Sequence, residues 1–154
     1  MELADVLGPD SVVPGLRVSS KKQALQELAR RAASLTGLHE RAIFDVLLER
    51  ERLGTTGVGN GIAIPHGKLG GLDRLHGLFA QLAKPIDYEA IDDQPVDLIF
   101  LLLAPQGAGA DHLKALARIT RLLRSRATCE KLRRATSAKA LRAVLIETEA
   151  SQAA

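Results

Sequence analysis

Apolar positions recur at helical spacing in two segments of the N-terminal third of the chain. The first runs from residue 20 to residue 34, and it opens with Ser20 followed three residues later by Gln23, which is a capping-box pattern. The second runs from residue 38 to residue 53, and a glycine follows each segment, as is typical of helix ends. The pattern predicts two amphipathic helices. The apolar stripe of the second consists of Ile43, Val46, Leu47 and Leu53.

Three short apolar segments, at residues 61–65, 77–83 and 97–103, predict β-strands. The first is expected to stop at Pro65, because proline cannot donate a hydrogen bond to a sheet. The third is apolar throughout, as expected for a strand that is buried on both faces. Residues 85–95 are expected to form a loop with a short edge strand.

Helical patterns return in the C-terminal third, at residues 111–124, 129–134 and 138–149. Asp111 is the expected N-cap of the first of these helices. Strands that are separated by helices indicate an α/β fold, in which helices flank a central sheet. We therefore expect residues 1–154 to form a single domain of this class.

The composition agrees with one globular domain. The chain has 154 residues, of which 46% are hydrophobic and 25% are charged. Aromatic residues make up only 3%, which argues against nucleic-acid binding by base stacking. The N-terminus lacks the basic segment of a signal peptide, and the longest apolar run, residues 98–104, is too short to span a membrane. We expect a cytoplasmic protein that neither inserts into a membrane nor binds nucleic acid.

Positive charge is concentrated between residues 113 and 134, where eight Lys and Arg residues accompany one acid, Glu130. Such a segment is either a solvated helix face or a docking surface for an acidic protein partner.

The glycine-rich stretch that follows the second helix does not match a nucleotide-binding loop. Five residues separate Gly61 from Gly67, and Lys68 is followed by Leu69, so the Walker A spacing is absent. The dinucleotide fingerprint fails as well, because an isoleucine stands where its third glycine would be. We expect no cofactor.

The segment Ile64-Pro65-His66-Gly67 is a candidate site. Pro65 fixes its own φ and favours an extended Ile64, so that His66 leaves the end of a strand in a restricted direction. Gly67 carries no side chain, so a partner or a phosphate is expected to approach the backbone there. Ligands often bind at strand ends in α/β folds. The alternative is a surface turn with an incidental histidine.

Two other side chains are expected to accompany His66. Arg50 lies on the apolar stripe of the second helix, so its guanidinium either reaches solvent or a carboxylate, or binds an anion at the sheet edge. His112 lies in the first turn of its helix, where backbone N–H groups attract anions and a histidine tends to stay neutral. His39 and His76 are expected at the surface. The set of Asp111, His112, His66 and His76 lacks the spacing of a metal site, so we expect no metal.

The segment of residues 50–68, RERLGTTGVGNGIAIPHGK, closely resembles the phosphorylation-site segment of enzyme IIA domains of the mannitol/fructose type (type 2). These domains belong to the bacterial phosphoenolpyruvate-dependent phosphotransferase system. The resemblance extends over nearly the whole chain and includes residues 94–98 and 112–116. The sequences GTTG and GIAIPHGK are most similar to the nitrogen-regulatory branch of that family.

The resemblance implies that His66 is phosphorylated, with Arg50 and His112 beside it. It implies a mixed sheet of about five strands flanked by helices, and no small-molecule cofactor. The implied donor is a histidine-phosphorylated carrier protein of the HPr/NPr type. Members of the nitrogen branch regulate other proteins, such as potassium transporters and sensor kinases, through their phosphorylation state.

Three alternatives remain open at this point. A sugar-transporting IIA component would pass the phosphoryl group to a IIB partner. A binding module would regulate its partners by contact alone and never carry phosphate. A metal-dependent hydrolase would need ligands that the sequence does not space as a known motif.

Overall fold

Strand β6 (Val96–Pro105) runs through the middle of a six-stranded sheet in the computed structural model, which describes residues 2–153. On one side β6 pairs antiparallel with β5 (His76–Ile86). Beyond β5, strand β1 (Val12–Leu16) pairs with it in parallel and forms that edge of the sheet. The predicted strand at residues 97–103 is thus the central strand.

Two short strands occupy the other side of β6, one after the other. Both β3 (Ile62–Ala63) and β4 (His66–Leu69) pair in parallel with β6, and β2 (Gly57–Gly59) pairs antiparallel with β3. Pro65 interrupts the pairing between β3 and β4, and its carbonyl accepts the N–H of Leu102 at 3.0 Å. The expected mixed sheet is confirmed. It has six strands where about five were expected, because the chain resumes pairing after the proline.

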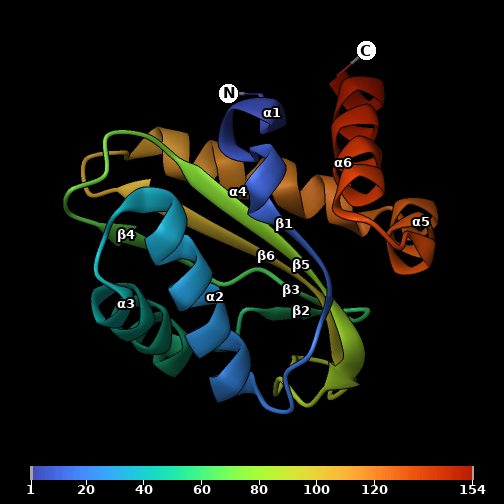
Figure 1. The fold of residues 1–154 in the computed structure, drawn as a ribbon, viewed down its shortest axis with the longest axis horizontal. Coiled ribbons are helices and arrows are strands. Elements are labelled where there is room, and N and C mark those ends of the chain that lie inside the picture. The colour runs from blue at the N-terminus through green and yellow to red at the C-terminus, as the bar shows by residue number, and fades with distance from the viewer. Residues whose placement is uncertain (1, 154) are drawn as a thin grey trace.

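Helices cover both faces of this sheet (Figure 1). One face carries α2 (Lys21–Thr36) and α3 (Glu40–Leu53), which are the two helices predicted from the N-terminal pattern. The other face carries four helices and, before β1, one 3₁₀ turn at Pro9–Ser11. The four helices are α1 (Leu3–Val6), α4 (Ala110–Arg124), α5 (Arg126–Arg134) and α6 (Ala138–Ala153). The expected single-domain α/β fold is confirmed.

Strand β6 contributes alternate side chains to the two hydrophobic cores. Ile99, Leu101 and Leu103 pack toward α2 and α3. Leu98, Phe100 and Leu102 pack toward α4, α5 and α6. The continuous apolar run in the sequence therefore reflects burial on both faces, as expected.

Helix ends agree with the sequence at α2 and differ at α4. The Ser20 hydroxyl accepts the N–H of Gln23 at 3.1 Å, and Gly37 ends the helix with φ of 77°. The prediction that Asp111 caps α4 is wrong, because Gly109, with φ of 53°, is the N-cap. Asp111 lies instead within the first turn, where a negative charge is favourable near the positive end of the helix.

The expected edge strand within residues 85–95 is also wrong. Strand β5 extends to Ile86, and the residues after it form an irregular loop. The edge next to β5 is β1, whose Pro14 and Gly15 weaken the strand pattern in the sequence. A strand that contains proline is tolerated at an edge, where one side of the backbone needs no partner.

Candidate functional site

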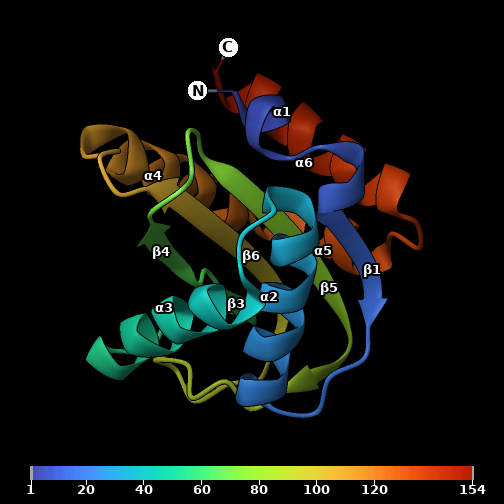
Figure 2. The same cartoon turned by 60° about the vertical axis from the view of Figure 1, so that its left-hand side comes forward.

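Strand β4 lies between α3 and α4 in both views of the fold (Figures 1 and 2). His66 follows the end of β3 after Ile64 and Pro65, as expected, and it is also the first residue of β4. A Cβ on Gly67 would lie only 2.4 Å from Cγ1 of Val46 on α3. The space above Gly67 is therefore occupied by α3, and the expectation that a partner or phosphate approaches there is wrong. The absence of a side chain lets α3 pack close to β4.

This packing places Arg50 beside His66, because Arg50 lies one helical turn beyond Val46 on the same face of α3. Its Nε donates to Nε2 of His66 at 3.2 Å, and its Nη1 donates to the carbonyl of Gly54 at 2.9 Å. Of the two alternatives for Arg50, the guanidinium thus takes the one in which it turns toward the sheet edge. A guanidinium has five N–H groups, so further donors remain for an anion at this point.

The two hydrogen bonds of His66 define the state of its ring. Nδ1 lies 2.8 Å from the carbonyl oxygen of Ile64, which can only accept, so Nδ1 carries the hydrogen. Nε2 accepts from Arg50 and therefore carries the lone pair. Since Pro65 fixes the backbone between Ile64 and His66, the local sequence itself supports the Nδ1 contact.

His112 completes the cluster from the first turn of α4. Its ring centroid lies 5.6 Å from that of His66, with the two planes tilted by 49°. The side chain is 7% exposed, and its Nδ1 is buried without a hydrogen-bond partner. The structure therefore brings together all three side chains that the sequence singled out: Arg50, His66 and His112.

Burial favours the neutral form of both rings. It lowers the pKa of His66, and the positive charge of Arg50 lowers it further, against the opposing effects of the Ile64 carbonyl and Glu51. Burial also lowers the pKa of His112, with smaller contributions from His66 and Lys68. A neutral imidazole has a nucleophilic nitrogen near pH 7. The two neutral rings are thus suited to accept an electrophile. The nearby cations are suited to neutralise an anion.

Sequence reasoning missed a polar cluster next to this site. Glu51, which follows Arg50 on α3, has a side chain that is only 4% exposed and forms an ion pair with Lys21 at 3.0 Å. Its carboxylate also accepts from Thr56. The sequence pattern gives little indication of this cluster, because a glutamate between two arginines at a helix end is typical of a surface residue. Lys68, two residues after His66, was likewise not assigned a role.

The remaining histidines lie away from these three. His39 is exposed, as expected, at the start of α3. His76 is half-buried as the first residue of β5, so the expectation of a surface position is wrong, and burial lowers its pKa. Within residues 2–153, no three His, Cys, Asp or Glu side chains gather closely enough to hold a metal ion.

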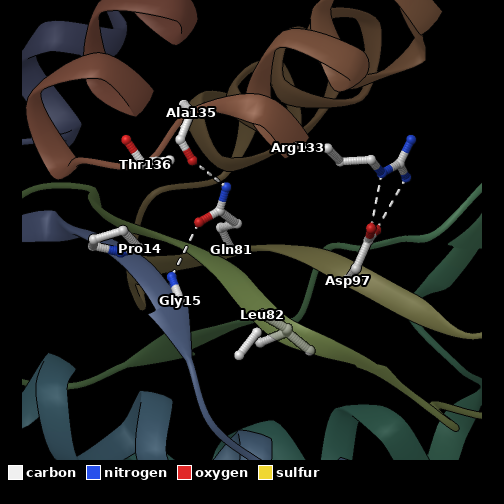
Figure 3. Close-up of a pocket in the computed structure, with 9 residues that line it drawn as sticks. Pro14, Gly15, Gln81, Leu82, Asp97, Arg133, Ala135 and Thr136 are labelled. Carbon is white, nitrogen blue, oxygen red and sulfur yellow. Dashed lines mark hydrogen bonds and ion pairs between the residues drawn. The ribbon is translucent and has the colours of Figure 1, made fainter.

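A cavity of about 450 Å³ lies elsewhere, between the β1–β5 edge and the segment that follows α5 (Figure 3). Its polar side chains bind one another. Arg133 makes a two-pronged pair with Asp97, and Gln81 bridges the N–H of Gly15 and the carbonyl of Ala135. The cavity therefore offers fewer unpaired groups for chemistry than the cluster around His66. Among the described helices, none is long and apolar enough to cross a membrane.

Comparisons with known proteins and structures all identify enzyme IIA proteins and their nitrogen regulatory relatives. Residues 5–148 match the family described as phosphoenolpyruvate-dependent sugar phosphotransferase system, EIIA 2. The nitrogen regulatory protein of Bradyrhizobium diazoefficiens is 62% identical over 145 residues, which cover 94% of this chain and 95% of that protein. The fructose-specific EIIA component of Haloferax volcanii is 39% identical over 130 residues, or 84% of each chain. The crystal structure of nitrogen regulatory protein IIA-Ntr from Neisseria meningitidis matches with a TM-score of 0.89 and 34% identity, over 93% of this chain and 98% of that one.

Proposed function

The chain belongs to the EIIA type 2 family of the phosphoenolpyruvate-dependent sugar phosphotransferase system, and from this premise we propose that it is a phosphocarrier of the nitrogen-regulatory branch. It accepts a phosphoryl group on His66 and regulates partner proteins through its phosphorylation state. The high identity to a nitrogen regulatory protein over nearly the whole chain supports the choice of branch.

The nucleophile in this proposal is Nε2 of His66. Because the ring is neutral and its hydrogen lies on Nδ1, the lone pair of Nε2 is available to attack the phosphorus of a phosphohistidine on the donor. The new Nε2–P bond forms as the N–P bond of the donor breaks, and the electron pair returns to the ring of the donor. The His66 ring becomes positively charged, and its Nδ1–H bond to the Ile64 carbonyl stabilises that charge.

Arg50 supplies the positive charge that phosphoryl transfer requires. Before transfer, the Nε–H of Arg50 donates a hydrogen bond to the lone pair of Nε2. When the phosphoryl group arrives, the guanidinium binds its equatorial oxygens instead. The bond to the Gly54 carbonyl keeps the guanidinium in place during this exchange.

His112 and the start of α4 contribute the other side of the phosphoryl site. As a neutral ring in the first helical turn, His112 donates a hydrogen bond to a phosphoryl oxygen without repelling His66. Its buried Nδ1, which has no partner in the unphosphorylated protein, is consistent with a ring that gains an interaction when phosphate arrives.

The donor in this proposal is a histidine-phosphorylated carrier protein of the HPr/NPr type, and both proteins act in the cytoplasm. The site needs no metal or cofactor, because the chain itself supplies the nucleophile and the cations. Regulated transporters or sensor kinases are the partners that the resemblance implies.

One observation carries the proposal: Nδ1 of His66 is held by a carbonyl while Nε2 faces a guanidinium. The test is incubation with the phosphorylated carrier, followed by intact mass measurement. The protein is expected to gain one acid-labile, base-stable phosphoryl group. His66→Ala is expected to abolish the gain, whereas His39→Ala, which changes an exposed histidine, is expected to retain it. A protein that gains no phosphate would instead be a binding module that acts by contact alone.

A second candidate within the same family is a sugar-specific IIA component. The 39% identity to a fructose-specific EIIA component favours keeping it open. The two are distinguished by mixing the phosphorylated protein with fructose- and mannitol-type IIB proteins. Retention of phosphate on His66 supports the regulatory role, and rapid loss to a IIB protein supports the transport role.

A further inference from the structure

The buried polar cluster next to Arg50 has a defined set of contacts. The Glu51 carboxylate accepts from Lys21 Nζ at 3.0 Å, from the backbone N–H of Thr56 at 3.0 Å and from the Thr56 hydroxyl. The Thr56 hydroxyl also lies 3.1 Å from that of Tyr88, and Lys21 Nζ lies 4.7 Å from the centroid of the Tyr88 ring. Thr56 is 3% exposed and Tyr88 is fully buried. Three separate parts of the chain thus converge on one buried negative charge.

Stability alone does not account for such a cluster. A buried ion pair costs desolvation energy on both sides, and apolar residues of similar volume often stabilise a protein equally well. What a fully hydrogen-bonded pair does supply is a fixed geometry, because any displacement leaves a buried charge without partners.

Thr56 links this cluster to the ring of His66 through two backbone groups. The carbonyl of Thr56 accepts the N–H of Ile64 at 2.9 Å. The carbonyl of Ile64 in turn lies 2.8 Å from Nδ1 of His66. Glu51 therefore fixes Thr56, Thr56 fixes Ile64, and Ile64 decides which nitrogen of His66 carries the hydrogen.

A second link runs from the same cluster to Arg50. Gly54 lies between Glu51 and Thr56, and its N–H donates to the backbone carbonyl of Glu51 at 3.1 Å. The carbonyl of Gly54 accepts from Nη1 of Arg50 at 2.9 Å. A turn that is held at both ends thus presents the acceptor that orients the guanidinium.

We propose that Glu51 is a positioning residue for phosphoryl transfer, which through Thr56 holds His66 in its Nδ1–H tautomer and through the Gly54 turn orients Arg50. Glu51 does not touch the reacting atoms. The inference rests on the proposed function for its effect on transfer, but its effect on the tautomer of His66 is measured without any phosphate.

The first measurement uses the unchanged protein, with ¹⁵N-labelled histidine and NMR at pH 7.5. The imidazole nitrogens of His66 are expected to show a protonated Nδ1 and an unprotonated Nε2. A ring with its hydrogen on Nε2 overturns the inference directly, whether or not the protein accepts phosphate.

Variants then test the relay. Glu51→Gln removes the charge that holds Lys21 and Thr56, and Thr56→Val removes the hydroxyl with little change in shape. Each is expected to populate the Nε2–H tautomer of His66 and to slow phosphoryl acceptance about tenfold or more, since misplaced reactive groups lose much of the advantage of orientation. The matched controls are Glu49→Gln, an exposed carboxylate on the same helix, and Thr56→Ser, which keeps the hydroxyl. Both controls are expected to retain the wild-type tautomer and rate.

The outcomes separate this inference from the proposed function. If the unchanged protein accepts no phosphate, the proposed function fails, while the tautomer spectra still decide the relay. If Glu51→Gln or Thr56→Val folds and keeps the wild-type tautomer and rate, the inference is overturned. If Glu51→Gln unfolds, Thr56→Val decides, and a spectrum of the unchanged protein with the hydrogen of His66 on Nε2 overturns the inference in every case.

Discussion

At the scale of the residue, the chemistry depends on the few groups that surround Nε2 of His66, the nitrogen that carries the lone pair. Nε2 has Arg50 as its hydrogen-bond donor, and the ring of His112 lies beside it. An arginine suits this position better than a lysine, because its planar fork binds two phosphoryl oxygens at once.

Replacing Arg50 by alanine is therefore expected to slow phosphoryl acceptance by about 10² to 10³, the loss typical of a removed charge-stabilising donor. Arg50→Lys is expected to recover only part of the rate. Stopped-flow or quench-flow transfer from the phosphorylated carrier measures the effect, and the exposed neighbour Arg52→Ala is the control. Wild-type kinetics in Arg50→Ala would remove Arg50 from the mechanism, provided that circular dichroism shows the native fold.

The sequence was informative about these residues where a side chain stood out against its surroundings. Neither an arginine on an apolar stripe nor a histidine directly after Ile-Pro fits well as an ordinary core or surface residue. The structure brings these two side chains together. Glu51 did not stand out, because its burial depends on Lys21, which lies thirty residues earlier on another helix. Contacts of that kind depend on how α2 and α3 pack and leave no trace in local spacing.

At the scale of the element, the close packing of α3 on β4 positions the site. Val46 fills the space over Gly67, and this contact sets the distance between Arg50 on α3 and His66 on β4. The sequence indicated that Gly67 is special but not why, since a glycine pattern does not say whether a ligand or a helix approaches. The strands β1 and β2 escaped prediction because each is short and contains glycine, which weakens the apolar pattern.

Gly67→Ala is expected to lower the free energy of unfolding by about 1–3 kcal/mol, as overpacking commonly does, and to slow phosphoryl acceptance because α3 moves away from β4. The stiff, branched side chain of Val46 cannot easily turn aside. Urea denaturation and transfer kinetics measure both effects. Gly70→Ala, where the added methyl meets no atom within 4 Å, is the control. The double variant with Val46→Ala is expected to recover most of the stability, and failure to do so would contradict this packing account.

At the scale of the whole molecule, β6 joins the two cores, and the sequence predicted this strand because it is apolar on both faces. Three histidines, of which His112 is buried and His66 and His76 are half-buried, are distributed around this framework. Burial lowers the pKa of His66, His76 and His112 below the usual value of 6.5. The folded protein therefore favours the neutral form of each of these histidines.

The stability of the protein is expected to fall as the pH decreases from 7.5 to 5. The sign follows from linkage: in the unfolded chain the three histidines titrate at their ordinary pKa of about 6.5, whereas in the folded protein they bind protons only at lower pH. The unfolded state therefore takes up more protons below that value and is favoured. Urea midpoints across this range measure the effect, and NMR titration gives the pKa of each ring. A constant or rising stability toward pH 5 would contradict the lowered pKa values of these histidines in the folded protein.

The most direct test of the account is the site of the phosphoryl group itself. The protein, labelled with ¹⁵N in its histidines, is phosphorylated by the carrier, and NMR identifies the nitrogen that couples to phosphorus. We expect the phosphoryl group on Nε2 of His66, with the hydrogen retained on Nδ1 toward Ile64. Phosphate on Nδ1 of His66, or on any other residue, would contradict the account.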